Sequence, residues 1–475
     1  HYARFAKIPI LEPSDSTEAK DFMRLAMEIS ERFRTPVIVR STTRISHSKS
    51  VVTLGERTPH KADGFEKNPQ LYVPIPIHAR KMRVAVEERS RQLTDYASHE
   101  CPCNIIMPGS DELGIITSSI AYQYAAETFK GASFLKLGMS FPFPDELIIR
   151  FCKGKKRILV IEELENFLEE HIRALGIDVH GRDLVPGIGE LDLDRMEEIL
   201  YKLNGKALPS RPAPETASLA PPRPPVFCPG CPHRGVFYEI AKHKPVIIGD
   251  IGCYSLAVFP PLSAMDMILC MGAGISSAMG VAKANTGQKV VGVVGDSTFF
   301  HSGITGLLDI AYNRGNVTIF VLDNRSTAMT GHQEHPGTGR TLMGETTSEA
   351  SIEDFARACG IKRIATLNPY DLETMRKVIK EELDAPEPSV IITRAPCILL
   401  KNARAGLEPV QINEDKCKTC GLCLKLSCPG LEKHTREDGT VRITVNPVLC
   451  TGCRLCVQVC PFKAFETRME KKQGE

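Results

Sequence analysis

The sequence lacks the features that would point to a membrane or a nucleic acid. No apolar run approaches the about 18 residues that a membrane-spanning helix needs, so we expect no membrane span. The formal net charge is only +2, and no long basic block or basic patch interleaved with aromatics occurs. Nucleic acid is therefore not an expected partner. The chain has neither an initiator methionine nor a signal-like segment and opens as if inside an element, so we expect a piece of a longer polypeptide.

Cysteine, by contrast, is abundant. The chain of 475 residues has 17 cysteines, and eight of them occur at metal-ligand spacing in the last 75 residues. This pattern favours metal chemistry in a reducing, cytoplasmic compartment over disulfide bonds. Cys152, Cys270 and Cys359 have apolar neighbours in the sequence and are expected in hydrophobic cores.

Hydrophobic periodicity predicts a multi-domain α/β protein with parallel sheets. Residues 1–72 contain a helix at 19–33 after the capping cluster Ser14-Asp15-Ser16, and they read as the second half of an α/β domain. The expected remaining parts are a charged helical connector at 73–104, a second α/β domain at 105–203, a proline-rich linker at 204–226, a third α/β domain at 227–400 and a cysteine-rich tail at 401–475. The acidic strand end Glu162, Glu163 and Glu165 is interpreted as a solvated rim.

A βαβ unit organises the third α/β domain. Its two apolar runs end in Gly295-Asp296-Ser297 and, 28 residues after the aspartate, in Asn324. Parallel strands bring these ends to one sheet edge, where two side-chain oxygens suit Mg²⁺. The pattern resembles the thiamine diphosphate motif, with Ser297 in place of the usual glycine, and Gly272 and Gly274 are candidates to present N–H groups to a diphosphate. The alternative is an ordinary buried unit whose Asp and Asn cap turns.

The tail contains two copies of a ferredoxin-type cysteine run, each ending in Cys-Pro. Three cysteines of one run and the last cysteine of the other are the expected ligands of each of two [4Fe–4S] clusters. One set is Cys417, Cys420, Cys423 and Cys460, and the other is Cys450, Cys453, Cys456 and Cys428. A zinc ribbon is the alternative, because paired Cys-x2-Cys motifs also bind Zn²⁺.

These motifs together resemble the 2-oxoacid:ferredoxin oxidoreductase family, and most closely the large (alpha) subunit of its indolepyruvate-oxidising branch. The resemblance rests on the segments 228–235, 249–254, 295–303 and 330–337 and covers essentially the whole chain. It implies a pyrimidine-binding domain represented by its C-terminal half at 1–72, a transketolase-C-like domain at 105–203, a diphosphate-binding domain at 227–400 and a two-cluster ferredoxin-like α+β domain at 401–475. In the family, the glutamate that activates the cofactor lies in the N-terminal half of the pyrimidine-binding domain. The resemblance does not include that half, so no residue here is given that role.

The resemblance also implies a reaction, with its cofactors and partners. Arylpyruvates such as indolepyruvate would be decarboxylated oxidatively to aryl-acetyl-CoA, with coenzyme A as acceptor and ferredoxin reduced, as in anaerobic amino-acid catabolism. Thiamine diphosphate would be held through Mg²⁺ by Asp296, Asn324 and the carbonyl of Ser326, with Thr330 nearby. A small (beta) subunit would complete a hetero-oligomer.

Four further cysteines match the family's order for a third [4Fe–4S] cluster beside the thiamine. They are Cys228, Cys231, Cys253 and Cys397. The alternative is that they are structural thiols in a shorter pathway.

The catalytic candidates are three histidines. His233 and His301 are acid/base candidates because histidine titrates nearest neutral pH, and each has a structural role as its alternative. His332 stands where relatives have glycine, and its role is open. Two other functions compete with the oxidoreductase: a non-oxidative thiamine-dependent decarboxylase, and an electron-transfer or scaffold subunit with an inactive thiamine fold.

Overall fold

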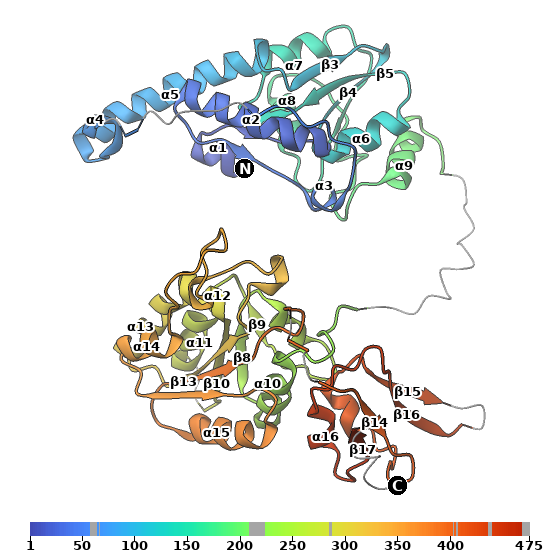
Figure 1. The fold of residues 1–475 in the computed structure, drawn as a ribbon. Coiled ribbons are helices and arrows are strands. Elements are labelled where there is room, and N and C mark those ends of the chain that lie inside the picture. The colour runs from blue at the N-terminus through green and yellow to red at the C-terminus, as the bar shows by residue number, and fades with distance from the viewer. Residues whose placement is uncertain are drawn as a thin grey trace. The chain divides into compact units, whose positions relative to one another are not determined.

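The computed structural model describes residues 1–57, 64–65, 67–208, 224–284, 287–401, 403–404, 407–435 and 439–467. The chain divides into two compact units, His1–Ala217 and Ser218–Glu475, which we describe in turn (Figure 1). Residues 209–223, most of the predicted proline-rich linker, lie outside the described residues. The domain boundaries expected from the sequence stay predictions.

The first unit holds two sheets flanked by helices. Its helices are α1 (Tyr2–Ala6), α2 (Ser16–Phe33), α3 (Thr43–His47), α4 (Pro69–Tyr72), α5 (Pro76–His99), α6 (Ser119–Thr128), α7 (Asp145–Cys152), α8 (Phe167–Ala174) and α9 (Leu193–Leu203). The larger sheet has the order β3-β5-β4-β7, with strands β3 (Asn104–Met107), β4 (Ser110–Ser118), β5 (Ala132–Leu137) and β7 (Ile158–Ile161). The smaller has the order β2-β1-β6, with strands β1 (Ile10–Leu11), β2 (Ile38–Val39) and β6 (Met139–Phe141). Chain segments expected in two different domains therefore share the smaller sheet.

Helix α2 shows how local sequence signals produce this unit. The carboxylate of Asp15 accepts a hydrogen bond from the N–H of Glu18, so the predicted cap is formed. The buried face of the helix presents Phe22, Ala26 and Ile29 at helical spacing. These side chains pack in one cluster with Leu93 from α5, which attaches the long helix to the body of the unit.

The interpretation of the acidic run as a solvated rim is wrong for Glu162. Its carboxylate accepts hydrogen bonds from the N–H groups of Leu168 and Glu169, in the first turn of α8. Burial is the main cause of the rise in its pKa from 4.5 to about 7. Glu165 is exposed, as expected for a rim.

The shifted pKa of Glu162 predicts a pH-dependent stability. An acid with a raised pKa binds a proton more readily in the folded than in the unfolded chain, so its contribution to the free energy of unfolding falls as pH rises from 4.5 to about 7. Glu162→Gln cannot titrate, and we expect wild type to lose stability relative to this variant across that window in thermal unfolding. Glu165→Gln is the exposed control, and parallel curves for wild type and Glu162→Gln would reject the assignment.

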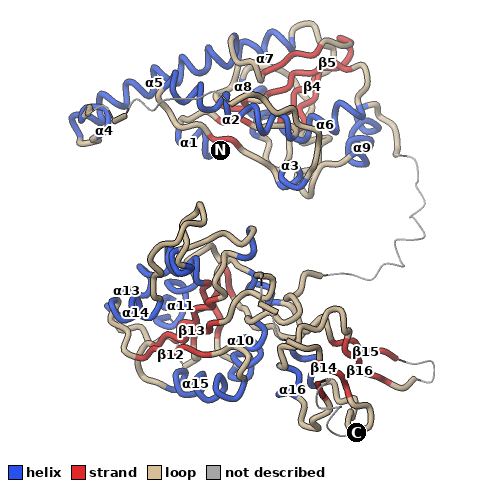
Figure 2. The backbone as a smooth tube through the Cα atoms, in the orientation of Figure 1, coloured by secondary structure: helices blue, strands red, loops and turns tan. Residues whose placement is uncertain are grey.

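The second unit is built on a six-stranded parallel sheet with the order β12-β13-β11-β10-β8-β9. Its strands are β8 (Val246–Gly249), β9 (Met267–Ile268), β10 (Val290–Gly295), β11 (Thr318–Asp323), β12 (Arg363–Leu367) and β13 (Ser389–Arg394). Helices α11 (Ala273–Ala284), α13 (Ile304–Tyr312) and α14 (Ile352–Ala358) cover one face, and α10 (His233–Ile240) and α15 (Leu372–Asp384) cover the other (Figure 2). The fold is therefore a doubly wound α/β sheet.

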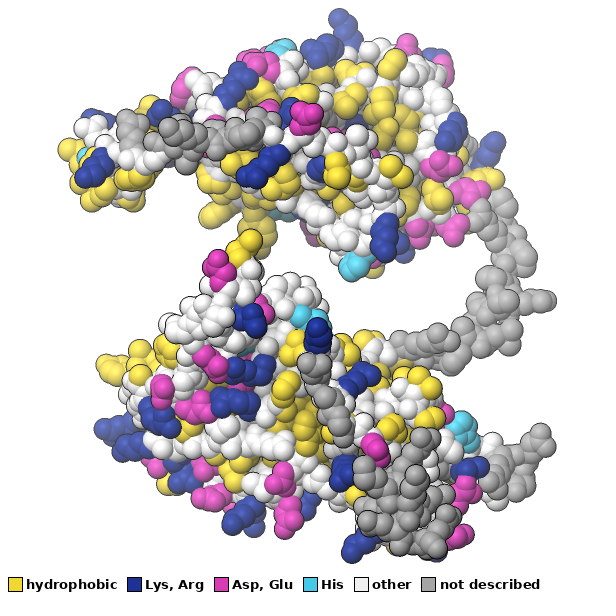
Figure 3. Space-filling view, in the orientation of Figure 1, with side chains coloured by type: hydrophobic (Ala, Val, Ile, Leu, Met, Phe, Trp, Pro, Cys, Tyr) yellow, Lys and Arg dark blue, Asp and Glu magenta, His cyan; other side chains and the backbone are white. Residues whose placement is uncertain are grey.

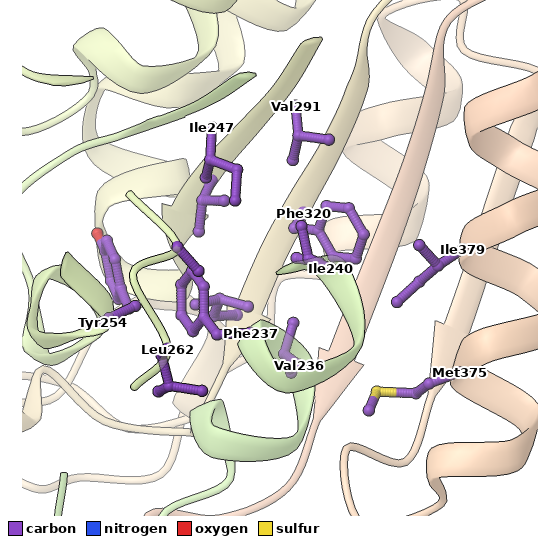
Figure 4. Close-up of a cluster of buried hydrophobic side chains, with 14 of the residues drawn as sticks. Val236, Phe237, Ile240, Ile247, Tyr254, Leu262, Val291, Phe320, Met375 and Ile379 are labelled. Carbon is purple, nitrogen blue, oxygen red and sulfur yellow. The ribbon is translucent and has the colours of Figure 1, made fainter. Parts of the chain in front are cut away.

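The strands supply both hydrophobic cores by alternation. Val291 and Phe320 point to the α10 side, whereas their neighbours Val290 and Ile319 point to the α11 side. Figure 4 shows Phe237 of α10 lying among the side chains that project from the strands. Both faces are buried, which explains why the strands read as continuous apolar runs.

The ferredoxin-like tail is part of the second unit and is described over residues 407–435 and 439–467. It contains two antiparallel pairs, β14 (Val410–Ile412) with β17 (Phe465–Thr467) and β15 (Leu431–Thr435) with β16 (Val441–Val445), and the short helix α16 (Leu455–Val459). Leu426 and Leu455 belong to the hydrophobic cluster that surrounds α10. Apolar contacts therefore pack the tail against α10.

The visible surfaces carry mixed charge. Basic and acidic side chains are interspersed on the faces drawn in Figure 3. In the part of the chain that the structure describes, no helix has the length and apolarity required to cross a bilayer.

Candidate functional site

A cavity of about 500 Å³ lies at the carboxyl ends of the central parallel strands. We call it the cofactor cavity. Its lining includes His233, Cys253, Tyr254, Gly295, Asp296, Ser297, Asn324, Ser326 and Thr330. The strand ends therefore bring most of the residues predicted for thiamine and Mg²⁺ binding to one place.

Asp296 and Asn324 converge on one backbone group. The N–H of Ser326 lies 3.3 Å from Oδ2 of Asp296 and 3.1 Å from Oδ1 of Asn324. Oδ1 of Asp296 accepts a second hydrogen bond, of 2.8 Å, from the N–H of Ser297. Both side chains are buried, so their oxygens are held in place beside the cavity. A carboxylate and an amide oxygen side by side suit a hard cation that also binds diphosphate.

His335, which is not among the site residues predicted from the sequence, also contacts Asp296. Its ring is buried, and its Nδ1 accepts a 3.2 Å hydrogen bond from the N–H of Gly337. The proton of the neutral ring must therefore be on Nε2, which donates to Oδ2 of Asp296 at 3.1 Å. His335 fixes the orientation of the carboxylate, as outer partners of metal ligands commonly do.

We predict that His335 sets metal affinity through this donor. His335→Leu should weaken Mg²⁺-dependent binding of thiamine diphosphate by about 10–100-fold, because the carboxylate loses its orienting hydrogen bond. His335→Gln, whose amide can replace Nε2–H, should recover most of the affinity. Calorimetric titration of thiamine diphosphate at several Mg²⁺ concentrations measures both, with the exposed His434→Gln as control. Equal affinity in wild type and His335→Leu would remove His335 from the site.

A second buried network joins the glycine-rich turns of the cavity. The hydroxyl of Tyr254 donates to Asp250 and accepts a 3.0 Å hydrogen bond from the N–H of Gly295. The other oxygen of Asp250 accepts from the N–H of Gly272 at 2.8 Å. Burial raises the pKa of Asp250 from 3.8 to about 6. Asp250 and Tyr254 therefore hold together the two turns that flank the cavity.

The two glycines predicted to face a diphosphate have clear steric reasons to be glycine. Gly272 has φ +87°, and a Cβ there would lie 1.9 Å from Oγ of Ser302. A Cβ on Gly274 would lie 2.7 Å from the carbonyl oxygen of Val293, so this glycine lets α11 pack closely on β10. Diphosphate binding by the two residues stays a prediction.

The three candidate histidines occupy different positions. His233 is buried, burial lowers its pKa from 6.5 to about 4, and its Nε2 lies 3.4 Å from Nδ2 of Asn324. It is therefore neutral near pH 7 and suited to orienting Asn324. His332 has φ +62°, and its Nδ1 lies 3.2 Å from Oγ of Ser326. His301 is exposed in the short π-helix Phe299–Gly303 that follows β10 and does not line the cofactor cavity.

The tail cysteines surround two cavities in the crossed pairing expected from the sequence. Cys428, Cys450, Cys453 and Cys456 line a cavity of about 420 Å³, which we call the inner cavity because Pro229, Gly230 and Arg234 also line it. Cys417, Cys420, Cys423 and Cys460 line the outer cavity, of about 330 Å³. No three His, Cys, Asp or Glu side chains within the described ranges are grouped to hold one metal ion. Each set of four thiols thus lines one hollow, which is the grouping expected for the ligands of a multi-atom cluster.

Of the other four cysteines predicted as ligands, two lie at the cofactor cavity or next to a residue that lines it. Cys253 lines the cofactor cavity, and the N–H of Cys397 donates to the carbonyl of Asn324 at 2.8 Å. Burial, followed by the nearby thiols of Cys397 and Cys228, raises the pKa of Cys253. Burial also raises the pKa of Cys231 to about 12, with smaller contributions from Cys228 and Cys253. Cys228 and Cys253 therefore each lie near both Cys231 and Cys397.

The remaining cysteines are partly as predicted. Cys152 and Cys359 are buried in hydrophobic clusters. Cys270 is exposed, so the prediction that it is a core residue is wrong. It precedes the glycine turn that starts α11, and a turn places its side chain outside the helix packing.

Comparison with known proteins agrees with this geometry. The family of thiamine pyrophosphate enzymes, C-terminal TPP binding domain, matches residues 250–393, and the 4Fe-4S binding domain matches residues 443–466. The indolepyruvate oxidoreductase subunit IorA of Methanothermobacter marburgensis is 38% identical over 490 residues, which cover 98% of this chain and 78% of the relative. Its counterpart in Thermococcus kodakarensis is 38% identical over 520 residues, covering 100% and 79%.

A solved 2-oxoglutarate:ferredoxin oxidoreductase from Magnetococcus marinus matches 54% of this chain and 89% of its own at 19% identity and a TM-score of 0.35. That likeness is too distant for comparing sites. The curated relatives and the domain families confirm the resemblance and the fold class expected from the sequence, with thiamine diphosphate and iron–sulfur chemistry in one chain. The chain belongs to the indolepyruvate oxidoreductase IorA family and is a subunit of a 2-oxoacid:ferredoxin oxidoreductase.

Proposed function

We propose that this chain carries out the oxidative decarboxylation of arylpyruvates, indolepyruvate among them, to aryl-acetyl-CoA while reducing ferredoxin. The main support is that the cofactor cavity and the cysteine-lined cavities lie in one compact unit. The cofactor cavity, four neighbouring cysteines and the two cysteine-lined cavities follow one another without leaving residues 224–467. Electrons released in the cofactor cavity would thus reach the proposed cluster sites within the same folded body.

The residues present fit thiamine diphosphate and Mg²⁺. When bound, thiamine diphosphate supplies a cationic ring that accepts the electron pair left by departing CO₂. Asp296, Asn324 and the carbonyl of Ser326 would hold the Mg²⁺. His335 orients Asp296, and His233 lies within 3.4 Å of the Asn324 amide. Tyr254 links the N–H of Gly295 to the carboxylate of Asp250 and so holds the ends of β10 and β8 together beside the cavity.

The proposal extends to clusters, partners and location. Two [4Fe–4S] clusters would occupy the inner and outer cavities, and a third would be held by Cys228, Cys231, Cys253 and Cys397. The proposed partners are a small subunit, ferredoxin and coenzyme A. A second subunit is proposed because the curated relatives compared above are named as one subunit of an oxidoreductase. A reducing cytoplasm suits a chain with 17 cysteines.

An anaerobic assay of the complete complex tests the proposal. With indolepyruvate, coenzyme A and ferredoxin, we expect ferredoxin reduction that depends on coenzyme A and forms an acyl-CoA. Aldehyde formation without ferredoxin reduction would instead identify a non-oxidative decarboxylase. Absence of thiamine from the purified active complex would identify an electron-transfer or scaffold subunit. Iron analysis of the same sample distinguishes two clusters from three, at about eight or about twelve irons per chain.

A further inference from the structure

Arg234 is a buried cation at the junction between the cofactor domain and the ferredoxin-like tail. It lies in the first turn of α10 and is 1% exposed. Its Nη1 donates to the carbonyls of Leu426, at 2.7 Å, and Ser427, both in the tail. Its Nη2 donates to the carbonyls of Phe227, at 2.8 Å, and Cys228, at 2.9 Å. One guanidinium therefore ties two chain segments almost 200 residues apart.

These contacts leave the charge of Arg234 without a counter-ion. Within the described residues, Arg234 forms no ion pair with a carboxylate, and its Nε has no hydrogen-bond acceptor. Neutral carbonyls satisfy most of its N–H groups but supply no net negative charge. An isolated buried charge is strongly unfavourable, so proteins pair such charges or place them beside a metal centre.

The surroundings of Arg234 indicate where the negative charge would be. The side chain lines the inner cavity together with Cys428, Cys450, Cys453 and Cys456. On the other side it is bonded to the backbone of Cys228. The two cysteine loops also approach closely, since a Cβ on Gly230 would lie 2.1 Å from Oγ1 of Thr451. The guanidinium thus lies between two sets of thiols.

We propose that Arg234 is the counter-charge of the cluster in the inner cavity and raises that cluster's reduction potential. The inference rests on the proposed function, because it requires the cluster there. A cubane held by four thiolates is anionic, and it gains one further negative charge when it takes up one electron. Arg234 keeps its proton, and no bond forms or breaks. A fixed positive charge alongside favours the more negative, reduced form.

The positive charge of Arg234 would favour electron transfer in one direction. Raising the potential of the inner cluster makes it a better acceptor for electrons that leave the cofactor cavity. The same residue fastens the tail through Leu426 and Ser427, so the electrostatic effect is present only when the tail is docked. Arg234 is therefore a positioning and tuning residue that need not contact substrate.

The test is a redox titration of the complete complex, with dithionite as reductant and the clusters followed by electron paramagnetic resonance. Arg234→Gln removes the charge and keeps donors, whereas Arg234→Lys keeps the charge and loses the planar fork. We expect Arg234→Gln to lower the equilibrium constant for reduction of the inner cluster at least tenfold, or about 59 mV for one electron. Arg234→Lys should retain most of the wild-type potential, and the outer cluster should be unchanged in both variants.

Arg376→Gln is the matched control. Arg376 lies on α15 and pairs with Glu239 of α10, so its replacement also removes a positive charge that contacts α10. Arg376 does not line either cysteine cavity, and we expect wild-type potentials. An unchanged inner potential in Arg234→Gln, or an equal drop in Arg234→Lys and Arg234→Gln, would overturn the proposal in favour of a purely structural fork.

A second measurement decides the case in which the variants lose iron. In the iron-free full chain, Arg234→Gln and Arg234→Lys both lose the fork, but only Arg234→Lys keeps the uncompensated charge. An Arg234→Gln thermal midpoint at or above that of Arg234→Lys supports the counter-charge, and a lower midpoint overturns it. If the proposed function is wrong because no cluster binds in the inner cavity, the redox titration of wild type itself will show no signal from that cluster.

Discussion

Replacing Asp296 with alanine is expected to abolish thiamine diphosphate binding and turnover. Among the described residues that line the cofactor cavity, only Asp296 has a carboxylate side chain. Its loss removes one of the oxygens proposed to bind Mg²⁺ and also leaves the N–H of Ser297 without its acceptor. Loss of an outer partner of a ligand typically costs about 10–100-fold in metal affinity, so loss of the ligand itself should exceed about 100-fold.

Asp296→Asn separates the effect of charge from that of shape. The variant keeps the volume and one acceptor oxygen, so we expect a folded chain with intact clusters that binds thiamine diphosphate poorly. Calorimetry at several Mg²⁺ concentrations measures binding, and iron analysis checks the clusters. Asp309→Asn, on the exposed side of α13, removes the same charge outside the cavity and should behave as wild type. Wild-type affinity in both Asp296 variants would show that the cavity is not the thiamine site.

Replacing Cys460 with alanine is expected to remove the cluster of the first cysteine run, although Cys460 belongs to the second. The reason is the crossed pairing, in which Cys460 lines the outer cavity with Cys417, Cys420 and Cys423. Iron should fall by about four per chain, the content of one cubane cluster. Ferredoxin reduction should fall to background, because the outer cavity includes the exposed Cys420 and the cluster proposed there would be accessible to ferredoxin.

The control for this prediction is a cysteine of the hydrophobic core. Cys359 is 8% exposed, packs among the side chains of α13 and α14, and its thiol lies 3.8 Å from the carbonyl oxygen of Ile304. Cys359→Ala should leave the iron content and the cluster spectra unchanged. If Cys460→Ala instead loses the cluster of the second run and keeps that of the first, the crossed pairing is wrong.

Local sequence signals were sufficient to predict the parallel sheet and the convergence of the residues proposed as ligands. The runs at β10, β11 and β13 are apolar throughout because both faces of the sheet are covered, and such runs can be read without tertiary information. Asp296 and Asn324 follow two adjacent strands, so their convergence was predictable from strand order alone. The cysteine spacing in the tail predicted the two sets that line its cavities.

Other elements could not be read in this way. Helix α10 begins inside a segment rich in proline, glycine and cysteine, which has the composition of a turn. It forms because Val236, Phe237 and Ile240 fill the space between the sheet and α15. Strand β12 is only half-buried at the edge of the sheet, so its alternation is weak.

Short sequence patterns were enough to predict the residue types proposed to bind cofactors and the strands that carry them, because those patterns extend over only a few residues. Which distant groups meet these residues depends on the folded chain. His335 reaches Asp296 across 39 positions, Tyr254 reaches Gly295 across 41, and Arg234 reaches Leu426 across 192. Such contacts depend on where the chain returns after packing. Hydrogen-bond geometry and burial of charge arise only once both partners are placed.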